Sequence, residues 1–192
     1  MAFGVVNFSE LTAMRKTFER LTTPEEQDIF YTKATKNIAA RMLAQLIKNT
    51  PVGKNTEEIQ DGETVVTMQG GTLRRGWLVR THAEAIASRR LSAAGNEAEA
   101  QKFTMKLHVG KRGSEYFITL RNNVKYASFV NYGHRQEVGR FVPAIGKRLV
   151  NGWVNGQYFV EISEVMIKPK IPAMLKKQMN DYLNKKLKMA NY

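Results

Sequence analysis

The stretch Thr23–Asn49, TPEEQDIFYTKATKNIAARMLAQLIKN, predicts the longest helix of the chain. Thr23 can cap this helix, Pro24 suits its first position, and Glu26 completes a capping box. Apolar residues then recur every three or four positions to the end of the stretch. Pro51 follows closely, and because residues before a proline disfavour helix, we expect the helix to end there.

Two segments flank this helix. Residues 1–22 predict a short helical arm, with Asn7 and Glu10 as a capping pair. Residues 53–72 are polar and rich in glycine, which indicates an extended loop insertion that can hold a hairpin around Thr64–Met68.

The middle of the chain, residues 76–120, predicts a strand, a helix and a hairpin. Gly76–His82 is typical of a strand, and Ala83–Ala94 favours a helix. Apolar residues alternate with polar ones over Phe103–Val109 and again over Tyr116–Leu120, on either side of the turn residues Lys111–Ser114. This spacing predicts a β-hairpin.

The last third begins with Tyr126–Tyr132, which predicts a short helix closed by Gly133. Residues 139–156 indicate irregular or short strand structure, and residues 157–192 a C-terminal helical segment interrupted by two prolines. We therefore expect one α+β domain over residues 1–192. In it, an antiparallel sheet with a β-hairpin packs against the long N-terminal helix and the C-terminal helix.

The composition narrows the possible functions. The chain has 192 residues, 30 Lys and Arg against 17 Asp and Glu, a net charge of +13, and no cysteine. Without cysteine there is no disulfide framework, thiolate catalysis or cysteine-ligated metal. Residues 65–192 carry 22 basic and 8 acidic residues. Such an excess indicates a polyanion or an acidic protein as partner, with a solvated lysine face as the alternative.

No catalytic, cofactor-binding or metal site is predicted. His82, His108 and His134 do not pair at metal-ligand spacing, and the first two fall in predicted strands. Gly110–Ser114 lacks the spacing of a phosphate loop. The carboxylates are scattered, so we expect no enzyme. No apolar run could span a membrane and no secretory leader pattern is present, so we expect the protein to work where it is made.

Four motifs carry a family resemblance, in this order: Lys48–Val52 at the end of the long helix, Gly71–Trp77, Asn123–His134, and Gly156–Phe159 leading into a C-terminal helix. Together they resemble the tail-completion or head–tail joining (neck) proteins of long-tailed bacteriophages and prophage-like particles. The resemblance covers most of residues 25–190. The chain departs from the family pattern in the intervening Gly53–Gly70, in a long 83–102 stretch, and in Asn131, where an acidic residue is common.

The resemblance implies a non-enzymatic virion protein, made in the host cytoplasm and without cofactors. Such proteins form rings, commonly sixfold, at the head-proximal end of the tail. They complete the tail and join it to the head connector, next to tail-tube or tail-terminator proteins, and DNA passes through the centre. The alternative from charge alone is a non-specific nucleic-acid-binding or assembly protein that acts through its basic surface.

The residues singled out are structural. Core or corner positions are expected for Trp77, Tyr126, Phe129, Tyr132, Gly133 and Phe159. Subunit or partner contacts are expected for Arg74, Arg75, Arg135 and Arg140. A closed ring needs two different patches on each subunit, which we place on the 53–72 loop and the C-terminal helix. The alternative for the loop is an insertion without defined structure.

Overall fold

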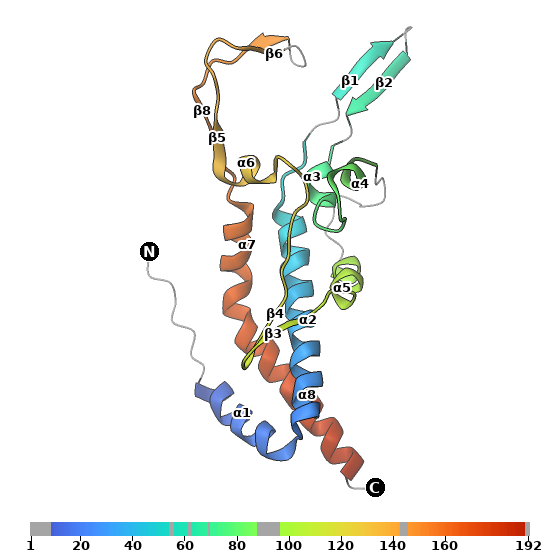
Figure 1. Ribbon diagram of the computed structural model, residues 1–192, viewed down its shortest axis with the longest axis vertical. Coiled ribbons are helices and arrows are strands. Elements are labelled where there is room, and N and C mark those ends of the chain that lie inside the picture. Colours follow the sequence, from blue (N-terminus) through green and yellow to red (C-terminus); the bar gives the residue numbers. More distant parts are fainter. Residues whose placement is uncertain are drawn as a thin grey trace. The chain divides into compact units, whose positions relative to one another are not determined.

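The computed structural model describes residues 9–53, 56–60, 63–68, 70–87, 97–142 and 146–190 (Figure 1). The helices are α1 (Ser9–Leu21), α2 (Pro24–Asn49), α3 (Thr72–Arg75), α4 (His82–Ala87), α5 (Glu97–Met105), α6 (Ala127–Tyr132), α7 (Phe159–Ile167) and α8 (Ile171–Ala190), with the 3-10 turn η2 (Lys168–Lys170) before the last. The strands are β1 (Thr56–Gln60), β2 (Glu63–Met68), β3 (Gly110–Arg112), β4 (Glu115–Phe117), β5 (Gly133–Arg135), β6 (Phe141–Val142), β7 (Lys147–Arg148) and β8 (Trp153–Asn155).

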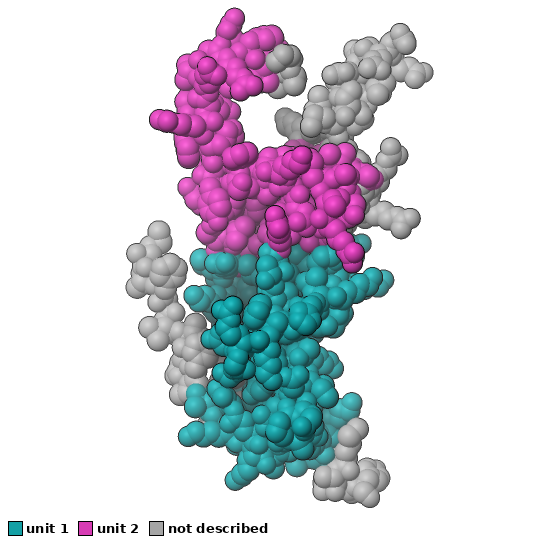
Figure 2. Space-filling view, in the orientation of Figure 1, with its two compact units in different colours: residues 1–45, 96–120, 164–192 teal, residues 46–95, 121–163 magenta. Residues whose placement is uncertain are grey.

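The α+β class is confirmed, but the strands of the described residues do not form one sheet. They form four antiparallel ribbons of two strands each, β1–β2, β3–β4, β5–β8 and β6–β7. The chain divides into two compact units (Figure 2). Unit 1 comprises residues 1–45, 96–120 and 164–192, and unit 2 comprises residues 46–95 and 121–163.

Unit 1 is built on an aromatic core between α1, α2 and α8. The centroid of the Phe18 ring lies 4.7 Å from that of Phe30 and 5.5 Å from that of Tyr182. Met179 and Ala34 are buried in the same cluster. Tilted and edge-to-face aromatic pairs add to the apolar area removed from water, so this contact holds the three helices together.

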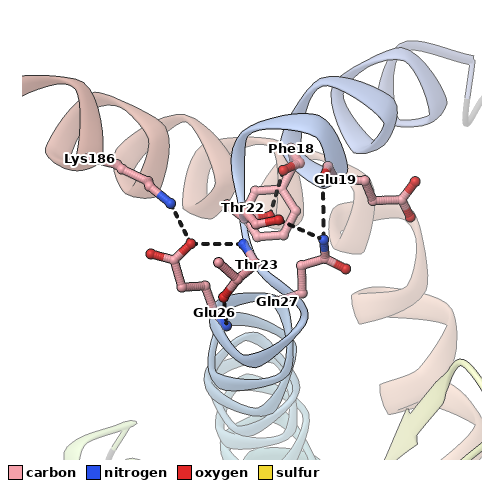
Figure 3. Close-up of polar contacts among 7 residues, drawn as sticks. All are labelled: Phe18, Glu19, Thr22, Thr23, Glu26, Gln27 and Lys186. Atoms are coloured by element: carbon pink, nitrogen blue, oxygen red, sulfur yellow. Dashed lines mark hydrogen bonds and ion pairs between the residues drawn. The ribbon is translucent and has the colours of Figure 1, made fainter. Parts of the chain in front are cut away.

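The corner between α1 and α2 shows the predicted capping box (Figure 3). The Thr23 amide donates to Glu26 Oε2 at 2.9 Å, and the Glu26 amide donates to Thr23 Oγ1 at 3.3 Å. Lys186 of α8 pairs with the same carboxylate oxygen of Glu26. Gln27 Nε2 donates to the Thr22 carbonyl at 3.2 Å. Glu26, which caps the start of α2, thus also binds Lys186 of α8 at this corner.

This corner predicts a pH dependence. The hydrogen bond from Lys186, followed by that from the Thr23 backbone, lowers the pKa of Glu26. A carboxyl whose pKa is lower in the folded state stabilises folding above its unfolded value and loses that contribution as the pH falls through the folded value. Glu26→Gln keeps a capping acceptor but removes the charge. At neutral pH the melting temperature of this variant should therefore be lower than that of the parent chain. At acidic pH the two melting temperatures should be equal.

Thermal unfolding followed by circular dichroism at neutral pH and at about pH 2–3, below the ordinary carboxyl pKa, checks this. Glu26→Ala, which loses the cap as well, should melt lower at both pH values. If Glu26→Gln lowers the melting temperature equally at both pH values, the charge of the Glu26 carboxylate does not contribute to stability.

The predicted strand at Phe103–Val109 is wrong. Residues 97–105 form α5, which buries Ala100 and Thr104. The hairpin is confined to β3 and β4 around Gly113, whose φ is +59°. His108 lies between α5 and this hairpin rather than in a strand.

The β3–β4 hairpin is held to α2 by one carboxylate. Asp28 accepts hydrogen bonds from Lys111 Nζ and the Tyr116 hydroxyl, each at 2.7 Å. These bonds, led by that from Lys111, lower the pKa of Asp28. The Gly110–Ser114 segment is therefore strand β3 and the turn of a hairpin.

In unit 2, the predicted strand at Gly76–His82 is also wrong, because the chain turns there. The Leu78 amide donates to the Arg75 carbonyl at 3.0 Å, and α4 starts at His82. The region 53–72 contains the β1–β2 hairpin. The short helix before Gly133, the short strands within 139–156 and the C-terminal helices are confirmed. The capping pair of Asn7 and Glu10 and the helix beyond Ala87 extend outside the described residues.

Candidate functional site

In unit 2, the first two sequence motifs meet at Thr50, just after α2. Thr50 is fully buried. Its Oγ1 accepts a hydrogen bond from Trp77 Nε1 at 2.8 Å and donates to the Leu46 carbonyl at 2.6 Å. Its carbonyl accepts from Arg74 Nε at 2.7 Å, and Arg74 Nη2 reaches the Lys48 carbonyl at 3.2 Å. The Gly71–Trp77 motif thus caps the end of the long helix, and Arg74 serves this internal contact.

The second and fourth motifs meet through two rings. Trp77 is 5% exposed and Phe159 is 2% exposed. Their ring centroids lie 6.4 Å apart with an interplanar angle of 88°, an edge-to-face arrangement. The structure places both residues in the interior of unit 2.

Arg75 is buried, in contrast to its expected role as a partner contact. Its Nε donates to the Ala85 carbonyl at 2.8 Å, its Nη1 to the Gly70 carbonyl at 2.9 Å and its Nη2 to Thr72 Oγ1 at 3.0 Å. Burial lowers the pKa of Arg75, because desolvation disfavours the charged form. Its guanidinium joins α3 to α4 within unit 2, so the contact assignment is corrected.

Replacing Arg75 by Met should destabilise unit 2 by about 2 kcal/mol, since it breaks charge-assisted hydrogen bonds and leaves carbonyls unpaired. Both tryptophans of the chain, Trp77 and Trp153, lie in unit 2. Urea unfolding followed by tryptophan fluorescence therefore measures the loss. Arg140→Met, at an exposed arginine of the same unit, is the matched control and should change little. Equal losses in the two variants would contradict the internal role of Arg75.

Asn123, the first residue of the third motif, and its neighbour Asn122 join this segment to residues 73–79, in and just after the second motif. Asn122 Nδ2 donates to the Leu73 carbonyl at 2.8 Å, and Asn123 Nδ2 donates to the Val79 carbonyl at 2.7 Å. The Asn123 amide also donates to the Gly76 carbonyl at 3.0 Å. A side chain at Gly76 would overlap Asn122, so glycine is required for this close approach.

Asn131 is the residue that sequence reasoning undervalued. It is 2% exposed. Its Oδ1 accepts from the Val160 amide at 3.1 Å, which caps α7, and its Nδ2 donates to the Glu161 carboxylate at 2.9 and 3.2 Å. The amide side chain supplies both the acceptor and the donor, whereas an ionised carboxylate at this position could only accept. The departure from the acidic residue common in the resembled family was the available signal.

Gly133 ends α6 in a conformation with φ of +85° and ψ of 174°. An added Cβ would overlap the backbone of Val154 and Gly156. Tyr126, just before α6, and Phe129 and Tyr132 within it are 39%, 54% and 56% exposed, so of the two expected settings, core or corner, the core is wrong for them. They lie at the surface because Asn131 takes the interior position of this short helix.

A family model described as "Bacteriophage HK97-gp10, putative tail-component" matches residues 12–133. The chain belongs to this family. Neither a curated protein nor a solved structure matches it. The match covers the first two motifs and the third as far as Gly133, where it ends. As a member of the HK97-gp10-like family, the chain is a structural component of a bacteriophage tail. It belongs to the virion and interacts with other virion proteins.

Beyond the matched residues, this tail component has a two-stranded arm. Strand β5 pairs with β8, and β6 pairs with β7. Backbone hydrogen bonds continue the ribbon between these pairs, from the Gln136 amide to the Gly152 carbonyl at 3.0 Å and from the Leu149 amide to the Arg140 carbonyl at 2.9 Å. We call Gly133–Asn155 the basic arm. The predicted contact residues Arg135 and Arg140 lie on it, both exposed.

The described part of this tail component has two further properties. None of its helices is long and apolar enough to cross a membrane. Across the same residues, no group of three or more His, Asp and Glu side chains is placed to hold a metal ion.

Proposed function

We propose that this chain acts as one α+β domain that forms a ring, sixfold in number, at the head-proximal end of the tail. The ring completes the tail and joins it to the head connector, and DNA passes through its centre. The contribution is structural and non-enzymatic. The family match over residues 12–133 carries the proposal, because it assigns the chain to phage tails.

The charge supports a place around DNA. Each copy carries a net charge of +13, so a closed ring of copies would produce a strong positive field in its channel. The same charge would also attract acidic surfaces of neighbouring connector or tail proteins.

Electron microscopy of the tailed particles that contain this chain, with symmetry-resolved averaging between head and tail, tests the proposal. We expect density for the chain as a closed ring, and its symmetry gives the copy number. Absence of the chain from the mature particle would overturn the proposal. It would favour an assembly factor or free nucleic-acid-binding protein, whose DNA affinity as a monomer would fall steeply with salt.

A further inference from the structure

Tyr158 has a strained backbone conformation. Among the described residues it is the one other than glycine with a positive φ, +48°. Glycine and asparagine tolerate this left-handed region, whereas a bulky side chain adopts it only at a cost. The surrounding chain holds Tyr158 there, because its amide donates to the Asn131 carbonyl and its carbonyl accepts from the Ile162 amide, each at 2.9 Å. The backbone at this position therefore favours glycine or asparagine over tyrosine.

The side chain of Tyr158 does not explain the strain from within the chain. It is 51% exposed. In the described part of the chain, its ring belongs to none of the aromatic pairs and its hydroxyl has no hydrogen-bond partner. Strained residues that the fold itself does not need are typical of functional sites. This combination indicates that the tyrosine ring is used in a contact outside its own chain.

Tyr158 lies close to two other exposed aromatic residues of unit 2, where the basic arm begins and ends. The hydrogen bond to Asn131 places its backbone beside Tyr132, which is 56% exposed. Trp153 is 53% exposed, and its Cζ2 would lie 3.1 Å from a Cβ added at Gly133. We call Tyr132, Trp153 and Tyr158 the aromatic surface. Exposed apolar groups that gather in this way mark contact sites between proteins, where Tyr and Trp are enriched.

Cations follow the aromatic surface along the basic arm. Arg135 is the partner of Trp153 across the ribbon. The other cations of the arm are Arg140, Lys147 and Arg148. All four are exposed, and none belongs to an ion pair found within the described ranges. The arm has a single acidic residue, Glu137. The complementary surface is therefore partly apolar and carries negative charge.

We propose that the aromatic surface docks on an acidic and partly apolar surface of a different virion protein, with Tyr158 as the anchor of the contact. This inference rests on the proposed function, because it names the surface that joins the chain to a neighbouring protein. A second copy fits less well, since its net charge of +13 would be brought against the cations of the arm. DNA also fits less well, because phosphate contacts need cations and leave the exposed rings without a partner.

Site-specific cross-linking in the tailed particles tests the occupant. The photoreactive amino acid p-benzoylphenylalanine replaces Tyr158, and the particles are irradiated. We expect a product that joins the chain to another virion protein, at a segment in which Asp and Glu outnumber Lys and Arg. The same amino acid at Phe117, which is 47% exposed in unit 1, is the matched control and should not give this product. A product with DNA, with a second copy or with a segment that is not acidic would overturn the inference, as would the absence of any product.

Two substitutions at Tyr158 separate docking from folding. Tyr158→Asn removes the ring and suits the left-handed backbone, so its unfolding midpoint in urea should equal or exceed that of the parent chain. Its incorporation into particles should nevertheless fall roughly tenfold or more, as for other aromatic anchors of interfaces. Tyr158→Phe keeps the ring and should be incorporated like the parent chain. Full incorporation of Tyr158→Asn, or a lower unfolding midpoint, would contradict the role of the ring.

Charge reversal tests the acidic character of the partner. Arg135→Glu places a negative charge opposite Trp153 and should lower incorporation, because it repels an acidic surface. Arg121→Glu, at an exposed arginine of unit 2 outside the arm, is the control and should be incorporated normally. Equal incorporation of the two variants would contradict an acidic partner at this surface.

The outcomes distinguish the inference from the proposed function. A ring seen by electron microscopy, together with a cross-link from position 158 to a second copy, would overturn the inference and leave the function standing. Absence of a ring, with the cross-link to another virion protein still formed, would overturn the function and leave the docking surface in place.

Discussion

Replacing Gly133 by Val is expected to prevent stable folding of unit 2. Gly133 has φ of +85° and ψ of 174°, a region that only glycine occupies readily, and forcing a side chain there costs roughly 1–3 kcal/mol. The new Cβ would also overlap the backbone of Val154 across the ribbon. Such overpacking adds roughly 1–3 kcal/mol, since the β5–β8 pairing must shift to relieve it.

Gly139→Val is the matched control for this substitution. Gly139 has φ of +86°, and an added Cβ there would meet no atom within 4 Å. Gly139→Val should therefore lose only the free energy of unfolding that comes from the strained backbone conformation, roughly 1–3 kcal/mol. Urea unfolding of both variants, followed by tryptophan fluorescence, gives the difference. If the two variants lose the same stability, the close approach of Gly133 to Val154 does not matter for folding.

Replacing Trp77 by Ala is expected to destabilise unit 2 by about 3–5 kcal/mol, as for other large aromatic residues in protein cores. The substitution removes the ring that packs edge-to-face on Phe159. It also removes the Nε1 donor to Thr50 Oγ1, at the point where the end of α2 meets the Gly71–Trp77 motif. Circular dichroism during urea unfolding measures the loss without relying on the deleted fluorophore.

The same substitution at the second tryptophan is the control. Trp153 is 53% exposed on the basic arm, and Trp153→Ala should cost much less stability. Similar unfolding midpoints for the two variants would contradict the assignment of Trp77 to the core.

The features best predicted from the sequence are those that depend on residues close together in the chain. The capping box of Thr23 and Glu26 forms as expected, because its partners lie three residues apart and need nothing else from the fold. The stop of α6 at Gly133 was equally local.

The strand predicted at residues 103–109 was wrong because the apolar residues of this segment fit both the two-residue period of a strand and the period of a helix. Phe103, Met105 and Leu107 alternate like a strand, but Ala100, Phe103 and Thr104 are also spaced like one face of a helix. The structure adopts the helix, with Ala100 and Thr104 buried. Periodicity alone could not decide between them, because burial against the rest of unit 1 sets the outcome.

The candidate site was found only in part, because its contacts are long-range. The motif order brought Trp77, Phe159 and Asn123 to attention, but it did not show what each side chain touches. Arg75 was expected at a surface and is buried, since its guanidinium bonds to carbonyls that the sequence does not mark. Phe129 was expected in the core or at a corner and is 54% exposed, because the spacing of apolar residues does not show which of them the rest of the fold covers.

The interleaving of the two units has a consequence for synthesis. Unit 2 cannot close before Phe159 and Val160 have left the ribosome, because Trp77 and Asn131 find their partners there. Unit 1 can be completed only later, after Met179 of α8 has been translated, because this residue belongs to its core. Both units are thus completed only when most of the chain has been translated, and neither can be produced alone as one continuous fragment.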